Sequence, residues 1–418
     1  MNKTIDFDVV IIGGGAAGFF TAINLANERP DYRIVILERG KEVLTKVRIS
    51  GGGRCNVTHA EFVPNELIKN YPRGEKELRG PFHTFCTGDT IDFFEKRGVA
   101  LKIEEDGRMF PVTDSSQTIV DCFTKEADKL GIKIYTGFSV KDFKKEEGCW
   151  KIESAISILR CDKLVVCTGS NPKIWNLLQQ LGHTIVPPVP SLFTFNCKDE
   201  RIKGLEGVSS HASIRIVSST KKSAKSKQHF IAEGPLLITH WGMSGPAILK
   251  LSAWGARELA NCNYQFRIEV NWLPELSFET CLFKLQESRK GMSKKAVGNS
   301  KVFELPKRLW LSFLDFCNLD TGKKWADLSN DDHKRLAEVL TRSIFHIQGK
   351  STFKEEFVTA GGVSLNEIDF RTFESKKHLK LYFAGEVINV DAVTGGFNFQ
   401  NAWTGAFIAA KSIAMSDT

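Results

Sequence analysis

The stretch Asp8-Val-Val-Ile-Ile-Gly-Gly-Gly-Ala-Ala-Gly18 decides the fold of this chain. The apolar run before Gly13 is typical of a buried strand in a parallel sheet, and residues 16–26 continue as a helix. Residues 33–38 then predict a second strand, which ends on Glu38, twenty residues after Gly18. Strand, glycine turn, helix and strand in this order predict a β-α-β unit.

The spacing G-x-G-x-x-G gives each glycine of this turn a mechanical role. Gly13 makes the tight turn, Gly15 lets a pyrophosphate approach the helix N-terminus, and Gly18 lets helix and sheet pack closely. Glu38 is placed to accept hydrogen bonds from ribose hydroxyls. The sequence therefore predicts a dinucleotide site, and disfavours a turn that merely connects two elements. The motif alone leaves both NAD and FAD open.

Three further glycine-rich junctions favour FAD, because they can hold the second half of a long ligand. In Ser50-Gly-Gly-Gly-Arg-Cys-Asn56, three glycines expose backbone amides and Arg54 adds positive charge. A flexible surface loop is the alternative for this segment. The second junction is Thr168-Gly169, which follows a predicted strand at 164–168.

A third junction precedes a helix predicted over 398–414. It contains Gly385-Glu386, Asp391 and the run 394–398. The positive end of such a helix would stabilise negative charge on a reduced flavin. The alternative is a purely structural helix with Thr394 or Asn398 as its N-cap.

The hydrophobic pattern changes along the chain and predicts three domains. Residues 1–190 alternate strands and helices up to a proline-rich boundary at 187–190, and 356–418 return to that pattern. A period of two, clearest at alternate residues of 264–272, predicts a β-rich insert over 191–274 and 346–355. Residues 275–345 are predicted to form a small helical domain, with Leu336, Val339, Leu340 and Ile344 on one helical face.

Composition restricts the class of protein. The 418 residues are 42% hydrophobic and 25% charged, enough for a full core. No run of about 18 apolar residues and no signal-peptide pattern occurs, so we expect a cytoplasmic protein with no membrane partner. The ten cysteines never form C-x-x-C or a zinc-type cluster, which predicts reduced core thiols, no metal site and no dithiol relay.

Six ordered motifs resemble those of the BaiN/YhiN-like NAD(P)/FAD-dependent oxidoreductases, over nearly the whole chain. They are Gly13–Gly18, Ser50–Thr58, Gly107–Pro111, Thr239–Pro246, Thr359–Val363, and Gly385-Glu386 through Asp391 to Thr394–Gln400. The resemblance implies an α/β fold, with a glutathione-reductase-type FAD/NAD(P)-binding Rossmann domain, an inserted β-barrel-like domain and a small helical domain. Val393 and Phe397 depart from the usual residues of the last motif.

The resemblance also implies the residues that contact FAD, which are Gly13, Gly15, Gly18, Glu38, Lys46, Gly52, Arg54, Cys55, Gly385, Glu386 and Gly396. Positions within or beside these motifs complete the predicted cofactor site, namely Ala17, Arg39, Ser50, Gly51, Thr168, Gly169, Asp391, Gly395, Phe397 and Asn398. For Cys55, backbone contact is favoured over thiol chemistry. No catalytic residue is identified by the sequence.

The leading functional hypothesis is a reductase that takes hydride from NADH or NADPH and passes it through flavin N5 to an unsaturated or carbonyl-conjugated small molecule. With no second G-x-G-x-x-G motif, the nicotinamide would bind only transiently. An FAD-dependent oxidase of a small amine, producing hydrogen peroxide, is one alternative. The other is a flavin-bound protein that binds or modifies RNA through the basic tip Lys221–Lys227, although this tip is more typical of a solvated turn. The net charge of +8 does not decide among them, and the oligomeric state is open.

Overall fold

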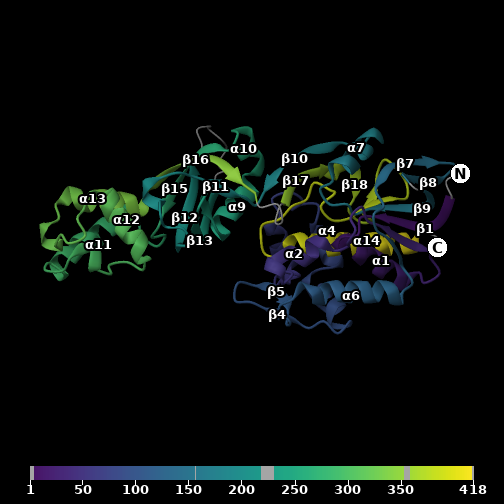
Figure 1. The fold of residues 1–418 in the computed structure, drawn as a ribbon, viewed down its shortest axis with the longest axis horizontal. Coiled ribbons are helices and arrows are strands. Elements are labelled where there is room, and N and C mark those ends of the chain that lie inside the picture. Colours follow the sequence, from purple (N-terminus) through teal and green to yellow (C-terminus); the bar gives the residue numbers. More distant parts are fainter. Residues whose placement is uncertain (1–3, 156, 218–229, 353–357, 417–418) are drawn as a thin grey trace. The chain divides into compact units, whose positions relative to one another are not determined.

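The computed structural model describes residues 4–155, 157–217, 230–352 and 358–416. The chain forms two compact units, which we call unit 1 (residues 1–189 and 354–418) and unit 2 (residues 190–353). Figure 1 follows the chain through both. The finer division into three domains stays a prediction.

The centre of unit 1 is a sheet built on the predicted β-α-β unit. Strand β1 (Thr4–Ile12) pairs in parallel with β2 (Ile34–Leu37) and β9 (Ile158–Val166). Parallel pairing extends to β6 (Lys133–Tyr135) on one side and β20 (Leu381–Phe383) on the other. Because the strands are parallel, their carboxyl ends meet at one edge of the sheet.

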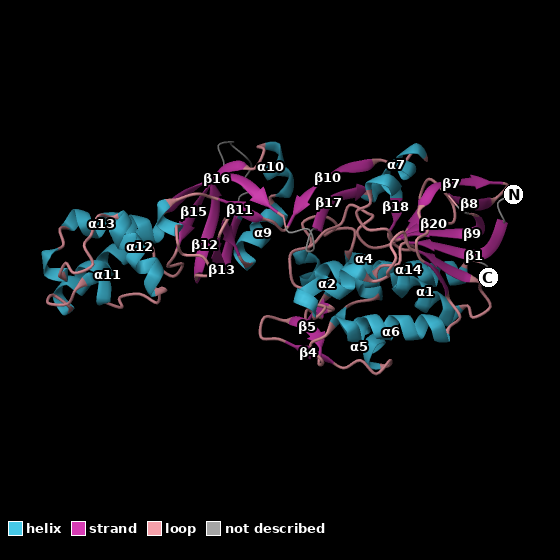
Figure 2. Ribbon diagram, in the orientation of Figure 1, coloured by secondary structure: helices cyan, strands magenta, loops and turns pink. Residues whose placement is uncertain are grey.

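Helices from both ends of the chain pack beside this sheet. Helix α1 (Ala16–Glu28) lies against α14 (Phe397–Met415) and α6 (Ser116–Lys129), as Figure 2 shows. Their interface is aromatic, with the rings of Phe20 and Trp403 5.1 Å apart and those of Phe123 and Trp403 5.6 Å apart. The C-terminal helix α14 thus packs beside the same sheet as the N-terminal helix α1.

Smaller elements complete unit 1. Strands β7 (Val140–Glu146) and β8 (Cys149–Ser154) form a hairpin, and β8 also pairs with β9. The proline-rich boundary lies in strand β10 (Ile185–Ser191), which pairs with β17 (Val358–Val363), because proline is tolerated in an edge strand. The remaining elements are α2 (Thr45–Gly53), β3 (Thr58–His59), α3 (Pro64–Leu67), α4 (Arg79–Thr84), α5 (Thr87–Glu95), β4 (Leu101–Ile103), β5 (Arg108–Pro111), β7 (Val140–Glu146), β8 (Cys149–Ser154), α7 (Pro172–Gln180), β10 (Ile185–Ser191), β17 (Val358–Val363), β18 (Ile368–Asp369) and β19 (Glu374–Ser375).

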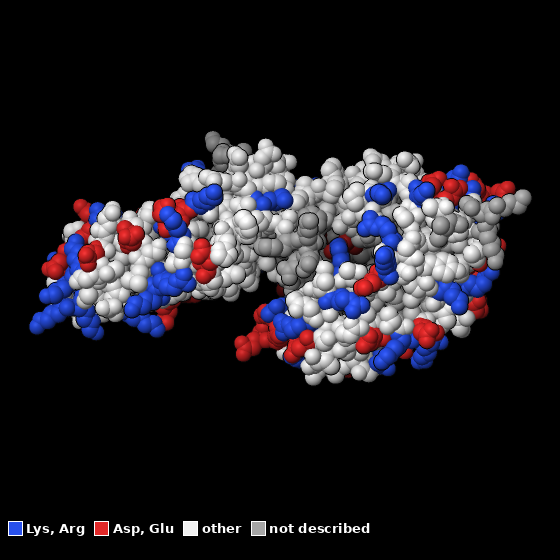
Figure 3. Space-filling view, in the orientation of Figure 1, with Lys and Arg blue, Asp and Glu red and all other residues white. Residues whose placement is uncertain are grey.

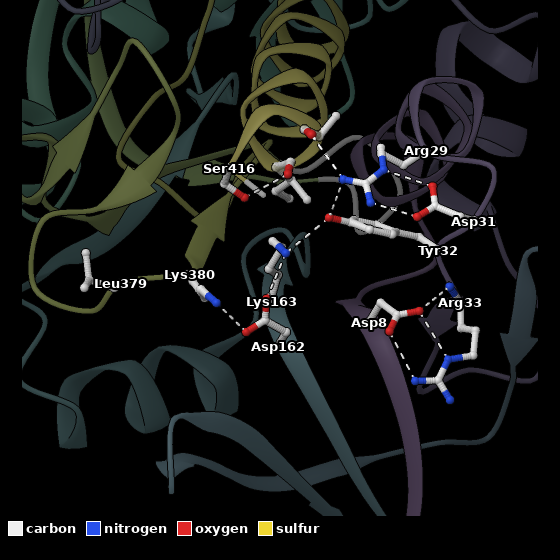
Figure 4. Close-up of polar contacts among 12 residues, drawn as sticks. Asp8, Arg29, Asp31, Tyr32, Arg33, Asp162, Lys163, Leu379, Lys380 and Ser416 are labelled. Carbon is white, nitrogen blue, oxygen red and sulfur yellow. Dashed lines mark hydrogen bonds and ion pairs between the residues drawn. The ribbon is translucent and has the colours of Figure 1, made fainter. Parts of the chain in front are cut away.

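A polar network joins the two chain ends of unit 1 (Figure 4). Lys163 on β9 is 1% exposed and donates to Asp162 at 2.8 Å and to the hydroxyl of Tyr32 at 3.3 Å. Arg29, after α1, donates to the same hydroxyl at 3.0 Å and to the carbonyl of Ala414 near the end of α14 at 3.4 Å. The buried ammonium group is thus paired, as the cost of desolvating a charge requires.

A second network lies around Glu367, which follows β17. Its carboxylate accepts hydrogen bonds from the backbone amide of Thr184 and from Nδ1 of the buried His183, both at 2.9 Å, and pairs with Lys377 at 2.7 Å. Burial would raise the pKa of Glu367, but the hydrogen bonds from Lys377, Thr184 and His183 outweigh it and lower that pKa from 4.5 to about 2.

This network predicts a pH-dependent contribution to stability. A carboxyl whose pKa is lower in the folded state than in the unfolded state stabilises the fold fully above pH 4.5. This stabilisation is lost as the pH falls toward 2. We expect Glu367→Gln to reduce the free energy of unfolding at pH 7 by on the order of 2 kcal/mol. Urea unfolding at pH 7, 5, 4 and 3 should show that the difference in unfolding free energy between wild type and variant decreases as the pH falls. The control is Glu66→Gln in the exposed Lys69 pair, and a deficit that stays constant with pH would contradict the account.

Unit 2 contains a closed six-stranded barrel. Its order is β11 (Thr194–Asn196), β14 (Gly242–Ser244), β13 (Ile231–Thr239), β12 (Ser209–Val217), β15 (Gln265–Asn271) and β16 (Ser343–Ser351). Alternate residues of β12 and β13 are buried, as a period of two predicts. Two helices, α9 (Pro246–Trp254) and α10 (Ala256–Asn261), interrupt the region that the sequence suggested was β-rich.

Three longer helices of unit 2 follow the strand β15 (Figure 2). They are α11 (Phe278–Gly291), α12 (Lys307–Phe316) and α13 (Asn330–Thr341). Leu336, Val339 and Leu340 are buried on α13 as predicted. The assignment of Ile344 to the same helical face is wrong, because α13 ends at Thr341 and Ile344 already belongs to strand β16, where it pairs with Glu269.

The cysteines are all free, and seven are buried. The prediction of core thiols is wrong for Cys149 and Cys262, which are exposed. Among the described residues, no helix is long and apolar enough to cross a membrane.

Candidate functional site

The carboxyl edge of the unit 1 sheet brings together the loops that follow β1, β2, β9 and β20. Gly13 donates its amide to the carbonyl of Leu37 at 2.8 Å, and Cys167 donates to Ile12 at 2.8 Å. A Cβ atom at Gly13 would lie 2.4 Å from the carbonyl oxygen of Cys167, and one at Gly18 would lie 2.0 Å from that of Gly13. Packing within the chain therefore requires glycine at positions 13 and 18.

Gly15 is different, because nothing within the chain requires a glycine there. Its φ of −94° suits any residue, and a Cβ atom at this position would have no other atom of the chain within 4 Å. Gly15 is also the N-cap of α1, which has no side-chain cap and no acidic residue in its first turn. Open space beside an uncapped helix N-terminus fits a pyrophosphate, which such a terminus attracts through free amides and the helix dipole.

The carboxylate of Glu38 is held at the end of β2. Its Oε2 accepts from the amide of Gly14 at 2.9 Å, and its Oε1 accepts from Gly40 at 2.6 Å. This places an acid directly beside the glycine turn, where a ribose of a dinucleotide would be expected. Arg39, the next residue, is exposed.

A second group of predicted residues meets around one ion pair. Lys46 of α2 pairs with Glu386 at 2.8 Å, although the two are 340 positions apart. A Cβ at Gly169 would lie 3.7 Å from Glu386 Oε2, and one at Gly385 would lie 3.1 Å from Cβ of Ala17. The structure thus brings the start of α1, α2 and the ends of β9 and β20 close together.

Thr168 provides an unsatisfied polar atom at this edge. Its Oγ1 is buried and has no hydrogen-bond partner in the part of the chain that the structure describes. A buried hydroxyl without a partner is costly unless a water or a ligand completes it. This atom fits a site completed by a polar ligand.

The glycine loop at 50–56 is the irregular end of α2. Gly51, Gly52 and Gly53 adopt left-handed φ values of 57°, 67° and 85°, which glycine tolerates best. Cys55 is also left-handed, and its amide donates to the carbonyl of Ser50 at 3.0 Å. Burial raises the pKa of the Cys55 thiol to about 12, so it is protonated at neutral pH. This supports a backbone role for Cys55 rather than thiolate chemistry.

The charge expected from Arg54 is balanced within the chain. Its guanidinium donates to Glu104 at 2.5 Å, lies 3.5 Å from Asp114, and stacks 3.9 Å from the centre of the Phe110 ring. The hydrogen bond to Glu104 raises the pKa of Arg54 further. Arg54 therefore contributes no net positive charge to the loop in this arrangement.

The N-terminus of α14 is held by tight backbone contacts. Its N-cap is Gly396, with no side-chain cap, so the proposed capping by Thr394 or Asn398 is wrong. Asn398 instead closes the preceding loop, accepting from the amide of Ala392 at 3.0 Å. A Cβ at Gly396 would lie 2.5 Å from the carbonyl oxygen of Thr58. As at α1, the first amides of a long buried helix lack a side-chain cap, which favours a negatively charged ligand.

His59 and Asn56 were not among the predicted site residues, yet both contact this helix terminus. The His59 ring stacks on Phe397 with centroids 4.4 Å apart, and its Nδ1 lies 3.1 Å from the carbonyl of Gly395. The Asn56 amide, turned to satisfy its neighbours, accepts from Gly396 at 3.0 Å. Asn56 lies within the Ser50–Thr58 motif and His59 follows it directly, and this position was the available sequence signal.

Asp391 has a structural partner that the sequence did not reveal. It is fully buried and forms a bidentate ion pair with Arg73, which is 13% exposed and 318 positions away. The nearby hydroxyl of Tyr71 donates to the carbonyl of Phe397 at 2.6 Å. These contacts fix the loop that leads into α14.

Other predicted features lie elsewhere or have no described position. His240, within the Thr239–Pro246 motif, has an 83% exposed side chain. The basic tip Lys221–Lys227 lies outside the described residues. Within the described ranges, no group of three His, Cys, Asp or Glu side chains is arranged to hold a metal ion.

Comparison with known proteins places this geometry in a family. The family model described as HI0933-like protein Rossmann domain matches residues 7–412. The chain is 30% identical over 417 residues to an Escherichia coli protein named ribosomal RNA dihydrouridine synthase, covering 97% of this chain and 98% of that one. It is 25% identical over 424 residues to the 3-dehydro-bile acid delta(4,6)-reductase of Clostridium scindens, again covering 97% and 98%.

Solved structures agree on the fold. The chain is similar, with a TM-score of 0.51 and 13% identity, to the 3-ketosteroid-delta4-(5alpha)-dehydrogenase of Rhodococcus jostii RHA1, covering 98% of this chain and 97% of that one. The predicted Rossmann-type α/β fold with an inserted barrel is confirmed. By its family match over nearly its whole length, this chain belongs to the HI0933-like, or BaiN/YhiN, family of FAD-dependent oxidoreductases.

Proposed function

We propose that this protein reduces a carbon–carbon double bond conjugated to a carbonyl group, with NADH or NADPH as the electron donor. The observation that carries the proposal is the chemistry common to two relatives that match over nearly their full lengths. Dihydrouridine is uridine whose C5–C6 double bond, conjugated to a ring carbonyl, has been reduced. A 3-dehydro-bile acid with Δ4,6 unsaturation likewise has double bonds conjugated to its ketone.

The reaction balances with a hydride donor and a proton. The β-carbon of the conjugated system receives a hydride, the α-carbon receives a proton, and NAD(P)H is oxidised to NAD(P)+. Bound FAD supplies hydride transfer between the nicotinamide and the substrate. The carbonyl is essential because it accepts the negative charge that develops as the hydride arrives.

The chain's own residues are proposed to bind and orient the cofactor. The open N-terminus of α1 at Gly15 would receive the pyrophosphate, and Glu38 the adenosine ribose. The uncapped N-terminus of α14 at Gly396 would stabilise negative charge on the flavin ring. The Lys46–Glu386 pair, beside Gly169, would lie along the cofactor between them.

Two substrate forms fit the proposed reaction, and the relatives provide a reason for each. A uracil ring in RNA is favoured by the Escherichia coli relative and by one from Haemophilus influenzae with the same name, 28% identical over 420 residues. A free enone is favoured by the bile-acid reductase. Both substrates require the same flavin chemistry, so assays with an RNA and with a free enone distinguish between them.

The first experiment is anaerobic addition of NADH or NADPH to the purified FAD-loaded protein. We expect the flavin absorbance near 450 nm to bleach within seconds, faster with one nicotinamide than with the other. Persistent yellow colour with both would contradict the proposed donor. Bleaching by a small primary amine, with hydrogen peroxide formed on readmission of oxygen, would instead identify an amine oxidase.

A further inference from the structure

The positive charge of this protein is segregated along the chain. Residues 190–353, which form unit 2, contain 25 Lys or Arg and 16 Asp or Glu, a surplus of nine positive charges. The remaining residues contain 32 Lys or Arg and 33 Asp or Glu, so their net charge is close to zero. The unit that carries the candidate cofactor site therefore does not carry the positive surplus. A pyrophosphate-binding role alone does not account for that surplus.

Within unit 2 the surplus is concentrated around helix α11 and the segment after it. Residues 284–308 contain eight Lys or Arg and only two Asp or Glu. Figure 3 shows Lys and Arg side chains gathered over the end of unit 2 that carries α11, α12 and α13. We define the basic ridge as five of the exposed cations of this end, namely Arg289, Lys290, Lys294, Lys295 and Lys324.

Backbone pairing brings the two parts of the basic ridge together. Residues 293–297 run antiparallel to 323–326, with Val297 donating to Lys323 at 2.9 Å and Trp325 donating to Lys295 at 3.1 Å. The buried Trp325 anchors this pairing through its indole N–H, which donates to Ser300 at 2.8 Å. Lys324 is thereby held beside the segment that contains Lys294 and Lys295.

The basic ridge has little internal charge compensation. Lys290 pairs with Glu287 at 2.8 Å. For Arg289, Lys294, Lys295 and Lys324, the structure has no ion pair within its described residues. By contrast, neighbouring cations such as Lys323 and Arg335 both contact Asp332. Lys294, Lys295 and Lys324 are held close together by the backbone pairing and have no ion pair among the described residues, so they raise the local positive potential and attract a polyanion.

An exposed aromatic ring accompanies these charges. Phe283 is 61% exposed on α11 and lies seven residues before Lys290, which places both on the same helical face. Exposed aromatic rings beside cations are the usual means of holding single-stranded nucleic acid, because bases stack on the ring while cations contact phosphates.

We infer that the basic ridge and Phe283 bind the sugar-phosphate backbone and an unpaired base of RNA. This inference rests on the proposed function, because it assigns the RNA form of the substrate a contact surface on unit 2. Each cation neutralises a phosphate and releases a counterion, so affinity falls steeply with salt. Phe283 contributes by stacking, which depends little on salt.

The test is fluorescence anisotropy of a labelled stem-loop RNA with a uridine-rich loop, titrated with oxidised holoenzyme at several salt concentrations. Replacing all five ridge cations by glutamine should weaken binding at least about thirtyfold near 0.1 M salt and reduce the salt slope by roughly three to four. Phe283→Ser should weaken binding about tenfold and leave the slope unchanged. The ridge residues are exposed, so melting temperature and FAD content should stay unchanged.

The matched control replaces five exposed cations of unit 1 by glutamine, namely Lys69, Lys96, Lys129, Lys144 and Arg371. Equal weakening by both sets would overturn the inference, because net charge alone would then explain binding. Equally tight binding of poly-L-glutamate would also overturn it, in favour of an acidic protein. No binding of RNA by the wild type at low salt would overturn it as well.

Failure of this inference is separate from failure of the proposed function. The anisotropy assay uses oxidised protein without an electron donor, so it reports binding alone. If the wild type binds no RNA but NAD(P)H bleaches the flavin and an enone restores it, the reductase proposal stands and the ridge assignment fails. If RNA binds through the ridge but no conjugated double bond is reduced, the ridge assignment stands and the reductase proposal fails.

Discussion

Gly15→Val is expected to give a folded protein that has lost its FAD. The substitution places a branched side chain in the open space at the N-terminus of α1, where no atom of the chain lies within 4 Å of the new Cβ. Stability should change by no more than about 1 kcal/mol, because the φ of −94° is ordinary and nothing is displaced. The pyrophosphate, by contrast, would lose its approach to the helix amides. We expect FAD affinity to fall at least about a hundredfold, or roughly 2.8 kcal/mol.

The measurement is the ratio of flavin to protein absorbance after purification, followed by a titration of the apoprotein with FAD. Circular dichroism and thermal melting report the fold. Gly80→Val is the matched control, because Gly80 lies in α4, has no positive φ, and also has nothing within 4 Å of a Cβ. Normal FAD content in Gly15→Val would refute the placement of the pyrophosphate. Loss of the fold would show that position 15 has an internal role.

The second large effect concerns the buried ion pair between Asp391 and Arg73. Asp391→Ala leaves a guanidinium that is only 13% exposed without its carboxylate. Removing one partner of a buried pair costs about 3–5 kcal/mol, since the remaining charge is neither hydrated nor paired. We expect a loss of this size in urea unfolding. The loop that leads into α14 should loosen with it, since Arg73 and Asp391 also form a backbone bridge.

Asp92→Ala is the control, because Asp92 and Lys96 form an exposed pair with side chains 65% and 73% exposed. Such a pair contributes at most about 1 kcal/mol. If Asp391→Ala were as stable as the wild type but purified without FAD, Asp391 would be a cofactor ligand, as the sequence motif suggested. The ion pair with Arg73 would then not be its main role.

Sequence patterns predicted the elements whose signals are local. The run Asp8–Gly18 specifies β1, the turn and the start of α1 within eleven residues, because burial and glycine geometry are both decided there. The long helix α14 was likewise predicted from its apolar stripe to within one residue at each end. The family resemblance then supplied the inserted barrel, which periodicity alone indicated only as a β-rich region.

What the sequence did not predict depends on contacts between distant residues. The run Pro246–Trp254 is apolar without clear periodicity, and only its packing in unit 2 makes it a helix. Arg73 carries no motif, so its pairing with Asp391 could not be found before the fold was known. His59 is similar, since its stacking on Phe397 joins residues more than 330 positions apart. Cys149 and Cys262, by contrast, had a local signal that went unused, because Cys149 follows Glu147-Gly148 and Cys262 lies between two asparagines.

The central claim, that a carbonyl-conjugated double bond is the electron acceptor, is tested most directly by reoxidation of the reduced enzyme. The flavin is reduced without oxygen by one equivalent of dithionite, and a steroid 4-en-3-one or a uridine-containing RNA is then added. We predict recovery of the 450 nm absorbance with at least one of them, together with a product two hydrogens heavier by mass spectrometry. A saturated ketone of the same skeleton should leave the flavin reduced. If the flavin stayed reduced with both unsaturated substrates and was reoxidised only by oxygen, the reductase account would be contradicted.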